Sequence, residues 1–268
     1  MASPQVLGVL NVTPDSFSDG GDFLDPSAAV AHGVQLYEAG ADWVDVGGES
    51  TRPGAREVSS AQELERVMPV IEGLVAQGVP VSIDSRRPEV MSAAVRAGAG
   101  LINDVNALRA PGALEVAAAC SARICLMHMQ GDPATMQRAP RYADVVAEVS
   151  AFLAERIAAC EAAGVDRRRL IVDPGFGFGK TQEHNLLLLA QIERLAALGV
   201  PVMVGVSRKS MLGRVTGREP KQRVAAGLAA VLWAVLHGAG WVRTHDVPET
   251  IDTLNMLAAI RAAHGEAS

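Results

Sequence analysis

The amino-acid sequence predicts one α/β domain over residues 1–268, a (β/α)8 barrel of the TIM type. Short apolar runs alternate with longer segments rich in alanine and leucine from end to end, a pattern typical of parallel strands that helices cover. The alternation gives about eight strand–helix units, the number that closes such a barrel. The length of 268 residues also fits one barrel, which takes roughly 250 residues.

The expected strands are brief and almost uniformly apolar. In chain order they are Gln5–Leu10, Trp43–Val46, Pro80–Ile83, Gly100–Ile102, Arg123–Met127, Leu170–Val172, Val202–Gly205 and Gly240–Val242. The expected helices are Ser27–Ala39, Ala61–Ala76, Glu89–Ala97, Ala113–Ala119, Ala143–Ala163, Glu183–Ala197, Lys221–His237 and Pro248–Ala263. Several of them are followed by glycine, which caps a helix end at least cost. The same alternation could also build an open, doubly wound sheet.

Composition and charge argue against several classes of protein. Hydrophobic residues make up 49% of the chain and charged residues 20%, unlike a disordered protein. A net charge of −6 argues against nucleic-acid or anionic-membrane binding, although local cations could hold an anionic substrate. No apolar run reaches bilayer length, and the first residues lack a secretion signal. The cysteines, Cys120, Cys125 and Cys160, form no CxxC pair, so we expect reduced thiols in a cytoplasmic protein.

Polar residues follow every expected strand. In a barrel the carboxyl ends of all strands meet at one face, where active sites lie. The segments at these ends are Asn11–Gly21, Asp45–Gly54, Asp84–Arg86, Asn103–Asp104, His128–Gly131, Asp173–Lys180, Ser207–Ser210 and Arg243–Asp246. Their recurrence in all eight units predicts a functional site at this face of the barrel.

Two constellations stand out among these segments. Asp84, Asn103 and Asp173 could accept hydrogen bonds from a ring N–H and an exocyclic amine, and together they favour an aminopyrimidinone ring. Each alone could equally be a turn residue or a helix cap. A cationic group could bind phosphate or diphosphate or could be solvated surface charge; its members are Arg52, Arg208, Lys209, Arg243 and His245.

Other motifs carry less information. Asn11 could hold Mg²⁺ through its amide oxygen, because Mg²⁺ keeps several waters and borrows few protein ligands. The glycine-rich loop before Lys180 is not a nucleotide-binding loop, because Pro174 stands where the P-loop needs a glycine. His128 remains a possible pocket residue, and the spacing supports no Ser-His-Asp arrangement. The run Arg167–Arg169 lies in a helix-to-strand connection, away from the predicted site.

Five strand-end motifs resemble those of the bacterial dihydropteroate synthase family. They are Leu10–Gly21, Asp45–Gly54, Cys125–Gly131, Asp173–Lys180 and Ser207–Ser210, and the similarity runs from Val6 to the last helix. The resemblance implies condensation of (7,8-dihydropterin-6-yl)methyl diphosphate with 4-aminobenzoate in folate synthesis, with inhibition by sulfonamides. It also implies Mg²⁺ and a homodimer. The apolar stretch Leu228–Leu236 could supply the interface or could simply pack on the barrel.

The resemblance assigns roles to individual residues, motif by motif. It implies that the pterin pocket is lined by Asp84, Asn103, Asp173, Lys209, Met127 and Phe178. The diphosphate and its Mg²⁺ would contact Asn11, Arg52, Arg243 and His245, and 4-aminobenzoate would lie beside Thr51, Pro53, Ser210 and Phe17. Catalytic roles fall to Lys209 in the pterin pocket and to Asp45 or Asp19, which could stabilise a pterin-derived cation as diphosphate leaves.

Two departures from the family pattern and two rival functions remain. Ser85 and Thr244 replace residues common in the family, and we expect the Thr244 side chain to point away from that of His245, with a small effect on activity.

A pterin-dependent methyltransferase would share the barrel and pocket but has no use for diphosphate ligands. A pterin-binding protein without catalysis is the other alternative. Diphosphate release that depends on 4-aminobenzoate would distinguish the synthase from both.

Overall fold

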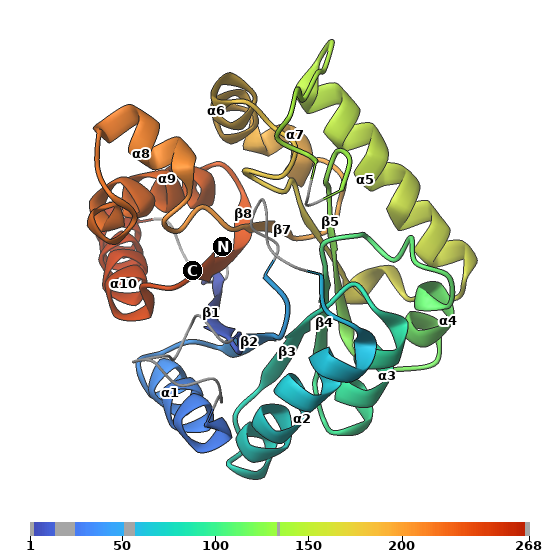
Figure 1. Cartoon of the computed structure of the whole chain (residues 1–268). Helices are drawn as coiled ribbons and strands as arrows, with labels where there is room; N and C mark the ends of the chain where they lie inside the picture. The colour runs from blue at the N-terminus through green and yellow to red at the C-terminus, as the bar shows by residue number, and fades with distance from the viewer. Residues whose placement is uncertain (1–2, 14–24, 51–56, 133–134, 266–268) are drawn as a thin grey trace.

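Eight parallel strands close into a barrel in the computed structural model, which describes residues 3–13, 25–50, 57–132 and 135–265 (Figure 1). Strands adjacent in the barrel are consecutive in the chain, and β8 pairs with β1 to complete the ring. The strands are β1 (Gln5–Asn11), β2 (Trp43–Gly47), β3 (Val81–Asp84), β4 (Leu101–Asp104), β5 (Arg123–Met127), β6 (Leu170–Asp173), β7 (Val202–Val204) and β8 (Ala239–Thr244). This closed order confirms the predicted (β/α)8 barrel and excludes the open sheet.

Helices connect the strands and form the outer layer (Figure 1). They are α1 (Pro26–Glu38), α2 (Ser60–Ala76), α3 (Pro88–Arg96), α4 (Ala113–Ala118), α5 (Val145–Ala162), α6 (Gln182–Ala190), α7 (Ile192–Ala196), α8 (Ser210–Thr216), α9 (Val224–Leu236) and α10 (Val247–His264), with short 3-10 turns at Arg167–Arg169 and Pro220–Gln222. Two differ from expectation. The helix expected over Glu183–Ala197 divides at Gln191, where the backbone leaves the helical region (φ −120°, ψ 35°). The sequence also did not predict α8, which is short and begins without a side-chain cap.

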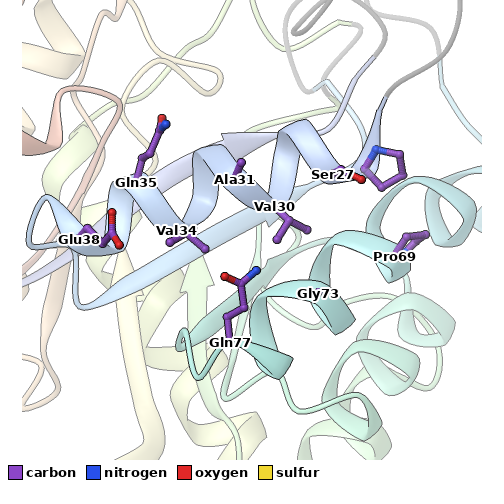
Figure 2. A pocket seen from close by; sticks show the side chains of 10 residues that line it. Ser27, Val30, Ala31, Val34, Gln35, Glu38, Pro69, Gly73 and Gln77 are labelled. Atoms are coloured by element: carbon purple, nitrogen blue, oxygen red, sulfur yellow. The ribbon is translucent and has the colours of Figure 1, made fainter.

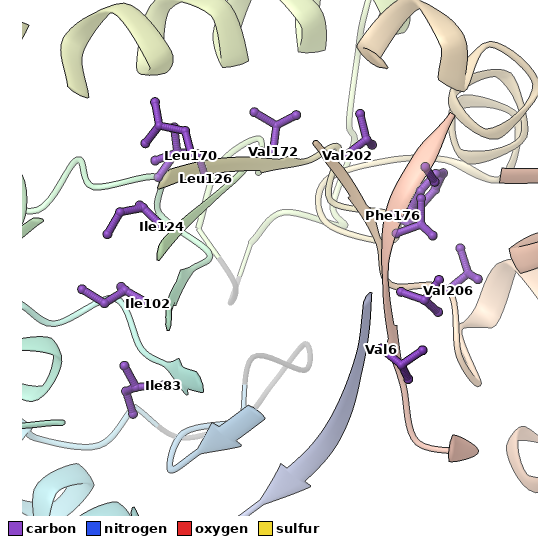
Figure 3. Packing of buried hydrophobic residues seen from close by; sticks show 14 of the residues in the cluster. Val6, Ile83, Ile102, Ile124, Leu126, Leu170, Val172, Phe176, Val202 and Val206 are labelled. Carbon is purple, nitrogen blue, oxygen red and sulfur yellow. The ribbon is translucent and has the colours of Figure 1, made fainter. Parts of the chain in front are cut away.

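The pleat of the strands separates two apolar layers. Outward-facing residues such as Ile83, Ile102 and Ile124 are fully buried against the helices, in one large cluster (Figure 3). A fully buried side chain of this size stabilises the fold by about 1.5–3 kcal/mol. Inside the barrel a separate cluster forms the floor, consisting of Leu7, Leu101, Cys125, Ile171, Met203 and Trp241.

The side chains that face into the barrel change from apolar to polar toward the carboxyl ends of the strands. Side chains on a strand alternate between faces, so Asn103 follows Leu101 on the inner face and Arg243 follows Trp241. Asp173 follows Ile171 in the same way. The barrel therefore has an apolar floor and a polar mouth, and the mouth is where the strand-end residues meet.

An open groove of about 670 Å³ lies between α1 and α2 in the outer layer. Val30 and Val34 line it from α1, Gly73 lines it from α2, and Gln77 lines it directly after α2 (Figure 2). None of the polar strand-end residues lines this groove. No helix in the described ranges is both long and apolar enough to cross a membrane.

Candidate active site

Asp45 lies at the centre of the polar mouth and is completely buried. Its carboxylate accepts hydrogen bonds from Ser82 Oγ at 2.5 Å, from Asn103 Nδ2 at 3.1 Å and from Arg243 Nε at 2.6 Å. Ser82 comes from the neighbouring position on β3 in the strand register. A buried carboxylate needs such partners, because desolvation otherwise favours its neutral form. Asp45 therefore organises the site as well as contributing its charge.

Asp84 is the second carboxylate that Arg243 contacts, with Nη2 at 2.7 Å from Oδ2. Burial raises the pKa of Asp84 to about 7, although Arg243 opposes the shift; repulsion from Asp45 adds to it. Arg243 was predicted to bind diphosphate. Two of its N–H groups are engaged by these carboxylates, and a guanidinium has five, so donors remain for a ligand.

Asp173 and Lys209 form the opposite side of the mouth. Asp173 Oδ1 accepts from the Gly175 N–H at 2.6 Å, and burial raises the pKa of Asp173, against the attraction of Lys209. Burial lowers the pKa of Lys209 to about 8, against the attraction of Asp173. The Lys209 ammonium donates to the Phe176 carbonyl and lies 4.8 Å from the centre of the Phe178 ring. This geometry brings together Asp173, Lys209 and Phe178, three residues that were predicted for one pocket.

Apolar residues form a wall beside these polar groups. Met127 and Phe178, both predicted for the pterin pocket, belong to one cluster with Val105, Met129 and Met136. The cluster is separate from the barrel floor and from the large outer core. Thioether and aromatic groups adapt well to a flat ring.

The loops after β5 and β6 are joined by Lys180, whose role the sequence did not reveal. Its buried Nζ lies 2.9 Å from His128 Nδ1 and donates to the carbonyl oxygens of Gly175 and Phe178, each at 3.0 Å. Burial, together with the nearby Lys180, lowers the pKa of His128 to about 3, so His128 is a neutral acceptor. Its ring packs edge-on against Phe152, with centroids 4.9 Å apart. His128 is thus a buried residue that packs between Lys180 and Phe152.

The close contact between these loops explains a glycine. Gly175 has a φ of +69°, and a Cβ there would lie 1.9 Å from the His128 carbonyl oxygen. No other residue type fits this position without moving the backbone. Gly175 therefore allows the two loops to pack closely beside the apolar wall.

Asn11 is the last residue of β1 and pairs in register with Gly47 of β2. Among the described residues, none hydrogen-bonds its side-chain amide. The described part of the chain also contains no group of three His, Cys, Asp or Glu residues able to hold a metal. The donor set therefore fits Mg²⁺ only in its usual mode with substrates, held by one protein oxygen, phosphate oxygens and water.

Several predicted residues lie outside the described ranges. These are Phe17 and Asp19 on the first loop and Thr51, Arg52 and Pro53 on the second. Ser210 is described: it is exposed and begins α8 directly after Lys209. The strand ends that support the two loops, Asn11 and Gly47, are adjacent in the barrel.

The sequence did not predict an ion cluster that lies at the end of β2. Arg87 contacts Glu49 at 2.8 Å and the almost fully buried Glu63 at 2.6 Å, and Arg86 contacts Glu49 at 3.2 Å. Together these pairs tie the end of β2 to α2 and to the loop after β3. Burial raises the pKa of Glu63, whereas hydrogen bonds from Arg87 and Arg86 outweigh burial and lower the pKa of Glu49.

The loops after β7 and β8 correct one expectation. Arg208 was grouped with phosphate-binding cations, but its guanidinium forms an ion pair with Asp246, with Nη2 2.5 Å from Oδ1. Ser207 lies between Asp246 and His245, which differs from a catalytic triad, where the histidine lies between the serine and the carboxylate. By contrast, the Arg167–Arg169 turn behaves as expected: Arg169 donates to the carbonyls of Ala117 and Ala122, at the start of β5 and so at the amino end of the barrel.

Comparisons with known proteins agree with this geometry. A model of the pterin binding enzyme family matches residues 7–245. The dihydropteroate synthase of Escherichia coli (strain K12) is 47% identical over 264 residues, which cover 98% of this chain and 94% of that protein. A structure of Xanthomonas albilineans dihydropteroate synthase with 4-aminobenzoic acid is 57% identical, with a TM-score of 0.92 over 97% of this chain and 94% of that one. A Yersinia pestis dihydropteroate synthase in a sulfonamide drug complex is 46% identical, with a TM-score of 0.92 over 97% and 95% of the two chains. The chain belongs to the pterin binding enzyme family, as one of its dihydropteroate synthases.

Proposed function

We propose that this enzyme condenses (7,8-dihydropterin-6-yl)methyl diphosphate with 4-aminobenzoate and releases 7,8-dihydropteroate and diphosphate. The observation that carries the proposal is the polar layer inside the barrel mouth, where Asp45 accepts from Asn103 and Arg243 and the same Arg243 also donates to Asp84. A flat ring with several N–H donors matches such a set of buried acceptors.

The pterin is proposed to lie between the carboxylates and the apolar wall. Asp84 and Asp173 accept from the ring N–H and amino donors, and Lys209 donates to the ring acceptors. Met127 and Phe178 cover the faces of the ring, next to the Lys209 ammonium. Because these groups come from the ends of four different strands, β3, β5, β6 and β7, the barrel holds the ring in one orientation.

The reaction breaks one bond and forms another at the methylene carbon of the pterin. As the C–O bond to diphosphate breaks, its electron pair leaves with the oxygen, and Asp45 or Asp19 stabilises the positive charge that develops on the pterin side. The arylamine nitrogen of 4-aminobenzoate then forms the new C–N bond and loses one proton. No covalent intermediate with the enzyme is needed.

Mg²⁺ is the proposed cofactor, held on the diphosphate by the Asn11 amide oxygen, where it would neutralise charge on the leaving group. Arg52, Arg243 and His245 are proposed to bind the same group through charge-assisted hydrogen bonds. Of these, His245 and Arg243 belong to the end of β8. Among the described residues, the Asn11 amide is the one proposed protein ligand of the metal. Loss of diphosphate should therefore release Mg²⁺.

4-Aminobenzoate is proposed to bind at the start of α8, beside Ser210, Thr51, Pro53 and Phe17. The exposed position of Ser210 next to Lys209 supports this assignment, since it places the second substrate beside the pterin. A sulfonamide, with its similar arylamine, would compete for the same place.

A diphosphate-release assay with the pterin diphosphate and Mg²⁺ tests the function. Release that requires 4-aminobenzoate and falls with a sulfonamide supports the proposal. Saturable pterin binding without aminobenzoate-dependent release would favour a methyltransferase or a pterin-binding protein, the two rivals that share the pocket. Omission of Mg²⁺ with excess chelator should reduce release, and unchanged release would remove Mg²⁺ from the account.

We also propose a cytoplasmic homodimer built from one domain over residues 1–268. Exposed apolar side chains on two helices in contact support the dimer, namely Trp233 and Leu236 on α9 and Met256 and Ile260 on α10. The unpaired cysteines support a reducing compartment. Light scattering coupled to size exclusion tests the dimer, with a mass twice the 28.0 kDa of the chain.

A further inference from the structure

Ser207 joins the loops after β7 and β8 through three hydrogen bonds. Its Oγ lies 3.3 Å from Asp246 Oδ2, 3.2 Å from the His245 backbone N and 3.2 Å from His245 Nδ1. A hydroxyl has one proton to donate and two lone pairs that accept. The three contacts therefore account for the whole hydrogen-bonding capacity of Ser207.

The direction of each bond follows from the chemistry of the partners. An ionised carboxylate only accepts, so the Ser207 proton points to Asp246. The His245 backbone N–H only donates, so it takes one lone pair of Ser207. The remaining lone pair faces His245 Nδ1, which must then carry a proton. The chain of bonds runs from His245 Nδ1–H to Ser207 and from Ser207 to Asp246.

Arg208 holds the Asp246 carboxylate in place. Its guanidinium contacts both carboxylate oxygens, with Nε 3.1 Å from Oδ1 and 3.4 Å from Oδ2. Arg208 adopts a φ of +59°, which is unfavourable for a residue with a Cβ. Arg223 stabilises this conformation by donating to the Arg208 carbonyl at 2.9 Å. Contacts with Asp246 and Arg223 thus hold Arg208 in an unfavourable backbone conformation, which indicates that the position of its side chain has a function.

The Asp246 carboxylate does not cap the helix that follows it, so capping does not explain its contact with Ser207. Asp246 precedes α10, yet its side chain caps no backbone N–H of that helix. Its backbone N–H donates to Thr244 Oγ1 at 3.1 Å, which fixes the turn between β8 and α10. The carboxylate is thus aimed at Ser207 and Arg208 rather than at the helix.

We propose that Asp246 acts through the Ser207 hydroxyl to fix the His245 ring as its Nδ1–H tautomer, so that Nε2 is the nitrogen that takes up a proton when the diphosphate is bound. Asp246 and Ser207 are positioning residues, because they act through His245. The link to diphosphate rests on the proposed function, whereas the tautomer does not. A partner on one ring nitrogen sets the tautomer presented by the other.

The tautomer can be measured without substrate. Two-bond ¹H–¹⁵N correlation spectra of protein labelled with ¹⁵N-histidine distinguish protonated from unprotonated ring nitrogens. The chain has 6 histidines, and the His245→Gln variant identifies the signals of His245 by their loss. Recorded at a pH where the ring is neutral, the wild-type spectrum should show a protonated Nδ1 and an unprotonated Nε2. The opposite assignment would overturn the proposal.

Two variants test the relay itself. In Asp246→Asn the new amide can donate to Ser207, which frees the Ser207 proton for His245 Nδ1, so the proton should move to Nε2. Ser207→Ala should give a mixture of tautomers. Asp252→Asn, which neutralises an exposed carboxylate on the same α10 helix, should leave the wild-type tautomer. An unchanged His245 spectrum in Asp246→Asn would overturn the relay even if the wild-type tautomer is as expected.

Turnover gives a second readout. Outer partners that orient metal-binding histidines typically contribute about 10- to 100-fold. By analogy, Asp246→Asn should lower kcat by about tenfold while the Kd of the pterin stays close to wild type. Asp252→Asn should keep the wild-type kcat. A changed tautomer with unchanged kcat would separate His245 from catalysis and overturn the catalytic part of the proposal. Absence of synthase activity in the wild type would instead contradict the proposed function and leave the tautomer standing.

Discussion

Arg243 and Asp45 are 198 positions apart in the chain, yet Arg243 Nε lies 2.6 Å from Asp45 Oδ2 inside the barrel. The same guanidinium reaches Asp84 with Nη2. Asp45 is completely buried, so it depends on neighbours such as Arg243 for its hydrogen bonds. The pair connects the last strand with the second across β1, at the polar mouth of the barrel.

Arg243→Met should therefore destabilise the protein strongly. Removing one partner of a buried ion pair typically costs about 3–5 kcal/mol, because the remaining charge stays buried. The free energy of unfolding from denaturant titration measures the loss. Arg214→Met, which changes an exposed arginine on α8, should cost little. Equal stability of the two variants would contradict the importance of the Arg243 contacts.

Pterin binding should have a narrow pH optimum between about 7 and 8. Asp84, with a pKa raised to about 7, is protonated below that pH and then accepts fewer hydrogen bonds from the ring. Lys209, with a pKa lowered to about 8, loses its charge above that pH. Both groups are charged only between these values, so affinity should fall on either side. Pterin Kd values from calorimetry across the pH range test this expectation.

Two variants test which residue causes the loss of pterin affinity at acidic pH and which causes it at alkaline pH. Asp84→Asn should flatten the acidic limb and leave the alkaline fall, because only Lys209 then titrates. Lys209→Met should do the reverse, with weaker binding throughout. An acidic limb that persists in Asp84→Asn would mean that another group, such as the buried Asp173, controls it.

Much of this site follows from the sequence, and the reason is the pleat of the strands. Asp84, Asn103 and Asp173 end strands whose inner face could be followed residue by residue, so their meeting at the mouth was predictable. Lys180 and Asp246 were not predicted, because their partners lie on other loops and no sequence period relates them. The short α8 was missed for a similar reason: it has no capping residue and little amphipathic length.

Lys180→Met should weaken the pterin site indirectly. The change leaves three buried acceptors without a donor, on His128, Gly175 and Phe178, and each unsatisfied group costs about 1–3 kcal/mol. We expect lower stability and a pterin Kd raised about tenfold, as the wall that contains Phe178 loosens. Lys221→Met, at an exposed lysine, is the matched control. Loss of stability with an unchanged Kd would show that the two loops are not coupled to the pocket.

Thr244→Val should change stability more than catalysis. The Thr244 side chain is buried and lies 3.2 Å from the Thr250 hydroxyl of α10, pointing away from the mouth as expected. Its Oγ1 also accepts from the Asp246 N–H, and losing a hydrogen bond of this kind costs about 1 kcal/mol. Denaturation should show that loss, with kcat within about twofold of wild type. A much larger fall in kcat would place Thr244 in the support of His245.

The most direct test of the central claim is the stoichiometry of the complete reaction. Purified enzyme, pterin diphosphate, 4-aminobenzoate and Mg²⁺ are incubated, and 7,8-dihydropteroate and diphosphate are quantified in the same samples. The account predicts that the two products appear in equal amounts and that neither appears without 4-aminobenzoate. Diphosphate released without a matching amount of dihydropteroate, or no turnover at all despite pterin binding, would contradict it.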